Sequence, residues 1–218
     1  RETFDIPIIG IAGSNGKTTV KEWLYQLLMD DYTVTRSPRS YNSQIGVPLS
    51  VWGLWAQSQI GIFEAAISQP GEMEALEAII QPTIGVFTCL GSAHQENFES
   101  MEQKCAEKLQ LFRDAQTLIY PADDPIVSKC VEQMDFRGKL IPWHRTGKGA
   151  MEDNKEICRA VCRHLGMSEE VINERVARLE PVAMRLEVKS GRNGCTLIND
   201  SYNSDLGSLD IALDFMSR

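Results

Sequence analysis

Apolar residues in the first two thirds of the chain gather in short runs that alternate with segments of helical spacing. The runs at residues 6–12, 59–63, 84–90, 117–120 and 140–143 have the length and composition of buried strands. Residues 17–29, 71–80 and 99–113 repeat their apolar positions with the period of a helix. The polar segment 36–47 between two of these elements predicts an ordered loop. Strands that alternate with helices predict an α/β fold, a three-layer P-loop NTPase-like core with a mostly parallel sheet.

The last third of the chain has a different pattern. Residues 152–165 and 168–179 predict two helices divided by Gly166, and residues 185–188 and 196–199 predict a hairpin around the glycines at 191 and 194. A final helix is expected from Leu206. Pro181 lies between the second of these helices and the hairpin. We therefore predict one domain over residues 1–180 and a second, separate unit over residues 181–218.

Composition excludes several functional classes. The net charge of −8 and pI of about 5.0 argue against nucleic-acid binding, which needs a basic surface. No run of about 18 apolar residues predicts a membrane span. The six cysteines form no C-x-x-C pair and are typical of reduced thiols in a cytoplasmic protein. A zinc site at Cys158, Cys162 and His164 is the weaker alternative.

A phosphate-binding loop is the strongest chemical signal. The first strand is followed by Gly13, Ser14, Asn15, Gly16, Lys17 and Thr18 at the start of a helix. Amide groups at a helix N-terminus favour anions, a lysine there reaches the β- and γ-phosphates, and a threonine hydroxyl holds Mg²⁺. The pattern therefore predicts ATP and Mg²⁺ as ligands. The alternative is a glycine-rich turn with a solvated lysine, because Ile11 occupies the place of the first glycine of the general pattern.

Glu64 strengthens the prediction of a nucleotide site. It ends the apolar run at residues 59–63. A carboxylate at the end of a strand is where P-loop enzymes hold Mg²⁺. Many strands end in glutamate for no such reason, so Glu64 indicates a metal site only in combination with the glycine loop that precedes it.

Five short segments follow one another in order along the chain: GSNGKT at 13–18, YNSQIGVPL at 41–49, ISQPGEM at 67–73, GSAHQENF at 91–98 and NDSYN at 199–203. Together they resemble the Mur ligases and the related folylpolyglutamate synthetases. Within the Mur ligases they are most similar to the branch that adds D-alanyl-D-alanine, in the form fused to an alanine racemase. Two positions depart from the family pattern: Ala66 stands where glycine is usual, and Cys89 stands where asparagine is usual.

The resemblance implies ATP-driven amide-bond formation in peptidoglycan precursor synthesis. The carboxylate of UDP-N-acetylmuramoyl-tripeptide would become an acyl phosphate, and D-alanyl-D-alanine would then displace the phosphate. Residues 1–180 would be the central ATP-binding domain, and residues 181–218 the hinge and the beginning of a truncated C-terminal domain. The chain does not begin with Met, and we expect it to be cut from a longer protein and to be inactive as a ligase alone.

The resemblance also implies roles for individual residues. Residues 13–19, including Thr19, would bind the phosphates of ATP, with Arg185 and Asp200 as further nucleotide contacts. Tyr41 and Asn42 would face the substrate. The catalytic set would be Lys17, Glu64, His94 and Lys108, and the metal ligands Thr18, Glu64, His94 and Lys108, the last if it is carbamylated.

Blander interpretations stay open beside these roles. His94 could be a hydrogen-bonded structural residue, Lys108 a solvated helix lysine, and Arg185 and Asp200 a surface ion pair. The whole chain could belong to another P-loop enzyme, such as a kinase or a folylpolyglutamate synthetase, or serve as a non-catalytic nucleotide-binding module.

Overall fold

A six-stranded parallel sheet forms the centre of the protein. The computed structural model describes residues 1, 3–202 and 206–217. The strand order is β2-β3-β1-β4-β5-β6, and every neighbouring pair is parallel. The strands are β1 (Ile8–Ala12), β2 (Val34–Arg36), β3 (Ile60–Glu64), β4 (Ile84–Phe87), β5 (Thr117–Pro121) and β6 (Lys139–Trp143).

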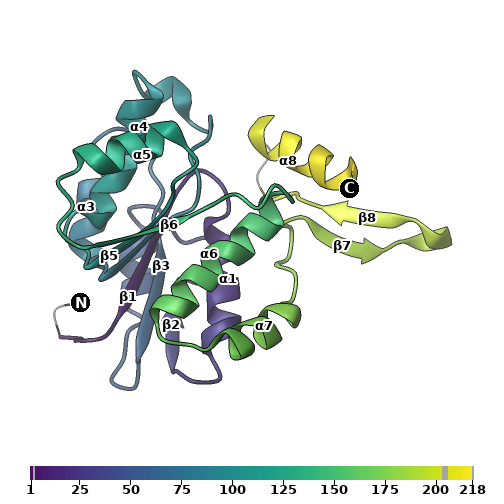
Figure 1. Ribbon diagram of the computed structural model, residues 1–218, viewed down its shortest axis with the longest axis horizontal. Coiled ribbons are helices and arrows are strands. Elements are labelled where there is room, and N and C mark those ends of the chain that lie inside the picture. The colour runs from purple at the N-terminus through teal and green to yellow at the C-terminus, as the bar shows by residue number, and fades with distance from the viewer. Residues whose placement is uncertain (2, 203–205, 218) are drawn as a thin grey trace.

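Helices cover both faces of this sheet. Helices α2, α3, α4 and α5 pack on one face, and α1, α6 and α7 on the other (Figure 1). Their bounds are α1 (Lys17–Leu28), α2 (Gly46–Val51), α3 (Glu72–Ile80), α4 (Met101–Leu109), α5 (Pro125–Gln133), α6 (Ala150–His164) and α7 (Glu169–Ala177). The predicted three-layer α/β architecture is confirmed.

Strand β1 shows why the predicted strands are continuous apolar runs. Ile8 and Ala12 point into the core shared with α3 to α5, whereas Ile9 and Ile11 point into the core shared with α1, α6 and α7. All five residues of β1 are buried, because side chains alternate between two faces that are both covered.

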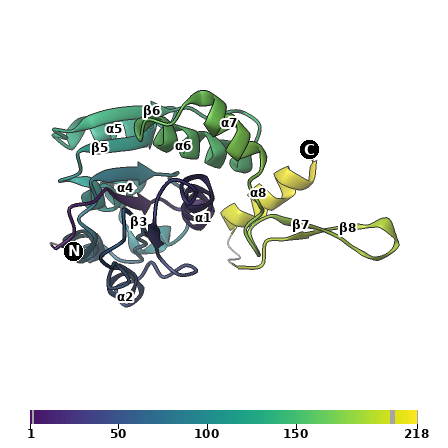
Figure 2. The same ribbon diagram turned by 90° about the horizontal axis from the view of Figure 1, so that it is seen from below.

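The chain ends in a hairpin and a helix that extend away from the sheet. Strands β7 (Glu187–Ser190) and β8 (Thr196–Asn199) pair in antiparallel fashion, and a short 3₁₀ turn, η3 (Arg192–Gly194), joins them. Helix α8 (Leu206–Ser217) follows, and Figure 2 shows these elements projecting from the layered core. The predicted hairpin and final helix are present, while the domain boundary at residue 181 stays a prediction.

Three elements of the structure, β2, α2 and α5, were not predicted from the sequence. The predicted loop at 36–47 is preceded by the edge strand β2 and ends in the helix α2, and helix α5 was not predicted at all. Strand β2 has three half-buried residues, too few for a periodic signal. Helix α2 has six residues and contains Pro48. Helix α5 did carry a start signal, since Asp124 caps the amides of Ile126 and Val127 just before a proline at the first turn.

The predicted helix at 99–113 is also shorter than expected. Helix α4 ends at Leu109, and the chain tightens into a 3₁₀ turn, η2 (Gln110–Phe112). This turn places Phe112 in the core against Phe87, with ring centroids 6.4 Å apart in an edge-on arrangement.

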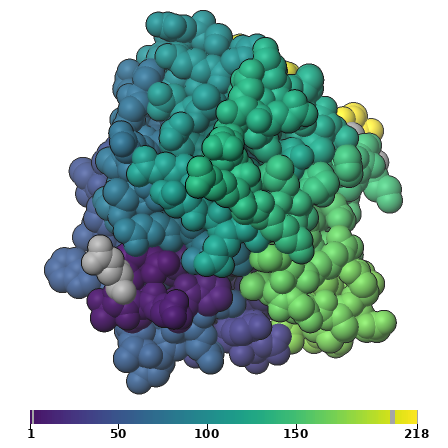
Figure 3. Space-filling model, turned by 60° about the vertical axis from the view of Figure 1, so that its left-hand side comes forward, coloured from purple at the N-terminus to yellow at the C-terminus, as the bar shows by residue number. Residues whose placement is uncertain are grey.

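The two ends of the chain lie on different sides of the molecule (Figure 1). In the space-filling view the purple N-terminal residues are in full sight, whereas the yellow C-terminal residues show only at the far edge (Figure 3).

Within the described residues, no helix is both long and apolar enough to cross a membrane. All six cysteines are free thiols, and neither Cys158 nor Cys162 belongs to a described group that could hold a metal.

Gly85 in β4 offers a test of this packing. A Cβ added there would lie 2.5 Å from a ring carbon of Phe112, whose side chain is fully buried. We predict that Gly85→Ala lowers the free energy of unfolding by about 1–3 kcal/mol through overpacking. Urea unfolding of Gly85→Ala, Phe112→Leu and the double variant measures it. The double variant should be less destabilised than the sum of the single changes, and strict additivity would contradict the assigned contact.

Candidate active site

A cleft of about 660 Å³ opens where the central strands end. The loops after β1 and β4 line it, and the first turns of α6 and residues of the C-terminal segment close its other side. The carboxyl ends of parallel strands meet at one edge of a sheet, which is where open α/β folds bind ligands. The residues predicted to bind nucleotide line this cleft, namely 13–19, Arg185 and Asp200. Asn42, predicted to face the substrate, and His94 and Lys108, predicted as metal ligands, line it as well, whereas the fully buried Glu64 is not part of the lining.

The loop after β1 needs glycine at two positions. Gly13 has φ +141° and Gly16 has φ +85°, a region that favours glycine. A Cβ at Gly13 would also collide with the hydroxyl of Thr88, and one at Gly16 would lie 2.6 Å from Asn154 Oδ1. Gly16 is the N-cap of α1 and has no capping side chain, so the amide groups at this helix end face the cleft uncapped. The geometry is that of an anion site.

Strand β4 and the residues after it brace this loop. The Ser14 amide donates to Cys89 O at 2.8 Å, and the Thr88 hydroxyl donates to Asn15 O at 2.6 Å. The Gly91 amide donates to Ser14 Oγ at 2.9 Å. Cys89, which departs from the family pattern, therefore supports the loop through its backbone. Its thiol lies 3.5 Å from Asn15 O and lines the cleft.

Three lysines surround the loop. Lys17 Nζ donates to Gly13 O and Ser14 O, both at 2.9 Å, and Lys108 Nζ lies 3.4 Å from Gly13 O. Lys104 donates to the carbonyls of Gly91 and Ala93. Lys108 is buried, and desolvation, followed by the charges of Lys17 and Lys104, lowers its pKa to about 7. The side chain of Lys108 therefore points into the site and not to bulk solvent.

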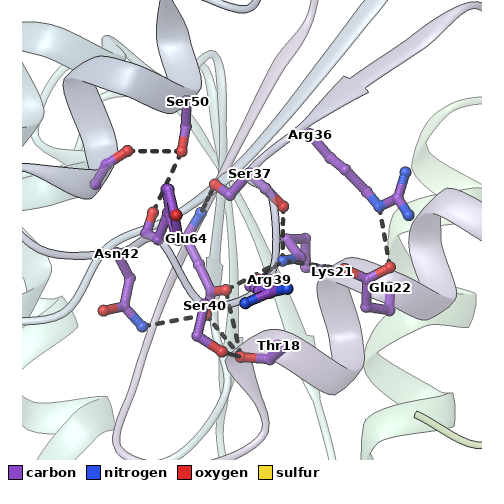
Figure 4. A network of polar contacts seen from close by, with 12 residues as sticks. Thr18, Lys21, Glu22, Arg36, Ser37, Arg39, Ser40, Asn42, Ser50 and Glu64 are labelled. Carbon is purple, nitrogen blue, oxygen red and sulfur yellow. Dashed lines mark hydrogen bonds and ion pairs between the residues drawn. The ribbon is translucent and has the colours of Figure 1, made fainter. Parts of the chain in front are cut away.

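Glu64 lies fully buried beside Thr18 (Figure 4). The Thr18 hydroxyl donates to Glu64 Oε2 at 3.0 Å, and Asn42 Nδ2 approaches the same oxygen at 3.4 Å. Lys21 Nζ pairs with the other oxygen, Oε1, at 3.2 Å. Hydroxyl and carboxylate oxygens are the ligands that Mg²⁺ prefers, so the donor set at Thr18 and Glu64 fits that ion.

The other predicted metal ligands lie across the cleft. His94 has a left-handed backbone, with φ +59°, at the start of the 3₁₀ turn η1 (Gln95–Asn97). It lines the cleft together with Lys108. Among the described residues, no group of three or more His, Cys, Asp or Glu side chains is placed to hold a metal. An ion here would therefore draw on hydroxyl, water and phosphate oxygens, as Mg²⁺ commonly does.

Arg185 does not form a surface ion pair with Asp200, which was the alternative interpretation of these two residues. Its guanidinium reaches the hydroxyls of Thr18 at 3.4 Å and Ser40 at 3.3 Å, and stacks on the Tyr202 ring at 4.0 Å. Burial lowers the pKa of Arg185, while the charge of Glu64 opposes that shift. Asp200 instead accepts the amide of Leu186 at 3.1 Å, which ties β8 to the segment before β7. Asn203 lies outside the described residues.

Some functional positions differ from the sequence prediction. Tyr41 is 44% exposed and lies outside the cleft lining, although Ser40 and Asn42 on either side line it. Sequence reasoning did not select Lys21, Ser40, Trp143 or Asn154. Asn154 lies in the first turns of α6 against the glycine loop, and Trp143 ends β6. The only available signal was position, since Trp143 is the last residue of the strand β6 and Asn154 lies in the helix that follows, at the edge of the sheet where the strands end.

Comparison with known proteins agrees with this geometry. The Mur ligase middle domain family matches residues 11–153. A relative from Bacillus subtilis (strain 168), named UDP-N-acetylmuramoyl-tripeptide–D-alanyl-D-alanine ligase, is 26% identical over 236 residues, covering 94% of this chain and 52% of its own length. A protein of the same name from a Synechocystis strain is 33% identical over 151 residues, covering 67% of this chain and 33% of its own.

Solved structures share the fold. The structure titled as the MurF ligase from Thermotoga maritima in complex with ADP superposes with a TM-score of 0.88 at 24% identity, covering 100% of this chain and 58% of that one. The chain spans about half the length of the curated relatives first matched. Because the family match extends over more than half of the sequence, and includes the glycine loop, Glu64 and His94, this chain belongs to the Mur ligase family.

Proposed function

We propose that this chain is the ATP-binding core of the Mur ligase that joins D-alanyl-D-alanine to UDP-N-acetylmuramoyl-tripeptide. The observation that carries the proposal is the convergence, in one cleft, of the glycine loop, Lys17, Lys108 and Thr18, whose hydroxyl contacts the buried carboxylate of Glu64 behind the cleft lining. The names of the relatives and the segment at residues 41–49 support this branch of the family. The reaction belongs to peptidoglycan precursor synthesis in the cytoplasm.

The cleft meets the main physical demand of the reaction. Transfer of the γ-phosphoryl group to a carboxylate brings two anions together, and their charge must be offset by fixed cations and amide dipoles. Lys17 supplies positive charge beside Gly13, and the helix α1 N-terminus supplies its dipole. The hydrogen bond from the Ser14 amide to Cys89 O and the one from the Thr88 hydroxyl to Asn15 O tie the loop to the residues that follow β4.

Thr18 and Glu64 would hold Mg²⁺, with His94 and Lys108 facing the same cleft from the other side. When bound, the ion would neutralise charge on the phosphate oxygens. Arg185 and Asp200 would close the nucleotide site from the hinge. Asn42 in the cleft lining and the exposed Tyr41 beside it would face the peptide substrate.

Other functions fit the observations less well. A folylpolyglutamate synthetase would share the loop, but the relatives that match over most of this chain carry the D-alanyl-D-alanine ligase name. A non-catalytic nucleotide-binding module would have no need for a desolvated lysine beside the phosphate loop.

From the sequence resemblance we also propose that the parent protein is the form fused to an alanine racemase. Sequencing of the full transcript tests this proposal.

Lys17 provides the first test of this function. In place of its present bonds to Gly13 O and Ser14 O, its ammonium would contact the phosphates of ATP. We expect Lys17→Ala to weaken ATP binding by about 1.5–3 kcal/mol, the value of a charge-assisted hydrogen bond. Isothermal titration calorimetry measures the affinity, with Lys129→Ala on the exposed face of α5 as the control. An unchanged affinity in a folded Lys17→Ala protein would rule out the phosphate site.

Lys108 provides a test of the metal-ligand proposal. Carbamylation joins the neutral amine to CO₂, forms an N–C bond, releases one proton to solvent and leaves an anionic oxygen ligand. Because the pKa of Lys108 is lowered to about 7, about half of its amine is neutral at pH 7 and most of it at pH 8, whereas an ordinary lysine is half neutral only near pH 10. We therefore expect carbamate to form as the pH rises through about 7.

Carbon-13 NMR in ¹³C-bicarbonate buffer measures this carbamate directly. The signal should be present at pH 8, fall away below pH 7, and be lost in Lys108→Met but not in Lys129→Met. A wild-type protein without a carbamate signal at pH 8, or a signal that survives Lys108→Met, would disprove the assignment.

A further inference from the structure

Lys21 is a fully buried lysine that the proposed function does not use. Its exposed fraction is 0%, and it lies on α1 three residues after Thr18, so both side chains emerge on the same side of the helix. It is one of the largest fully buried side chains described. A buried ammonium is costly unless every donor is satisfied, which directs attention to its partners.

Four oxygens surround the ammonium of Lys21 (Figure 4). It donates to Ser37 O at 2.8 Å and to Arg39 O, and it lies 3.2 Å from Glu64 Oε1 and 3.1 Å from Glu22 Oε1. An ammonium has three donors, so these acceptors use all of them. Lys21 therefore has no donor left for a phosphate and differs in kind from Lys17.

The carboxylate of Glu64 takes its orientation from this arrangement. Lys21 holds Oε1, and Oε2 contacts Asn42 Nδ2 and is the oxygen nearer to Thr18 Oγ1, at 3.0 Å against 3.3 Å for Oε1. The backbone of Glu64 is held from the same side, because its amide donates to Ser37 Oγ at 3.3 Å. One oxygen of the carboxylate is thus held by Lys21 and the other is presented to the proposed metal position.

The same lysine holds the loop at residues 37–42. It binds the carbonyls of Ser37 and Arg39, and Arg39 has a left-handed backbone with φ +50°. Directly after this bend, Ser40 Oγ lies 3.0 Å from Thr18 Oγ1. Lys21 is therefore the one side chain shown in Figure 4 that contacts both the carboxylate and two carbonyls of this loop.

A purely structural role does not account for this choice of residue. A buried ion pair can often be replaced by apolar side chains with no loss of stability. A cation beside a metal position also opposes metal binding by charge. The contacts of Lys21 indicate a different role, because they set the direction of the Glu64 carboxylate and the path of the loop at residues 37–42.

We propose that Lys21 is a positioning residue of the ligase, which holds Glu64 for the metal–nucleotide complex and joins the loop at 37–42 to the phosphate loop. This role rests on the proposed function. Residues that orient metal ligands commonly change metal affinity about 10- to 100-fold when they are replaced. The effect should therefore appear in the dependence of nucleotide binding on Mg²⁺, and not in nucleotide binding itself.

The experiment measures ADP affinity of the 218-residue chain by calorimetry, once with MgCl₂ and once with EDTA. Wild-type protein should bind ADP more tightly with Mg²⁺. Lys21→Met should lose most of that gain, about 10- to 100-fold, while its affinity in EDTA stays the same. Lys21→Arg keeps the charge and is the variant to use if Lys21→Met does not fold. Its planar guanidinium does not reproduce the three divergent bonds, so it should lose the gain as well.

Glu22→Gln is the matched control. Glu22 touches Lys21 from the opposite side and pairs with Arg36 at 3.0 Å, so the change weakens the same network without freeing Glu64. Its stability should fall while its gain from Mg²⁺ stays intact. A folded Lys21 variant with the full wild-type gain would overturn the positioning role. Wild-type protein that binds no ADP, or shows no gain from Mg²⁺, would instead overturn the proposed function.

Discussion

The complete burial of one carboxylate at the end of β3 governs the arrangement of the site. Glu64 has no exposed surface, so its charge must be balanced by groups of the protein. Lys21 and the Thr18 hydroxyl come from α1, and Asn42 comes from the loop after β2. Three segments that are distant in sequence are therefore held together by one charge, and the path of the loop at residues 37–42 follows from it.

The glycine loop depends on a second constraint, the close approach of β1 and β4. Gly13 leaves no room for a side chain beside Thr88, and the hydroxyl of Thr88 in turn holds Asn15. Lys108 reaches this place from α4, on the opposite layer of the sheet from α1. Burial there, together with two neighbouring lysines, lowers its pKa, so the chemistry available to Lys108 depends on the packing of the layers.

Local patterns predicted the fold well where elements are long and buried on both sides. Strands such as β1 and β3 are continuous apolar runs, and α1 repeats its apolar residues with a helical period. The patterns failed for the edge strand β2 and for the helix α2, which have only three and six residues. In such elements tertiary contacts decide the conformation, because too few residues are present for a periodic signal.

The sequence by itself determined the glycine loop and the acid at the end of β3, because each depends on neighbours within a few residues. Spacing alone set Gly13, Gly16, Lys17 and Thr18 between a strand and a helix. Only the tertiary structure decided which lysines are buried and what they touch. Lys21, Lys104 and Lys108 look alike in sequence, as lysines on amphipathic helices. In the structure Lys21 holds a carboxylate, Lys104 holds two carbonyls of the loop after β4, and Lys108 faces the glycine loop. Helical period predicts which face of a helix is covered but not what covers it, and the covering groups here come from strands and loops up to 95 residues away.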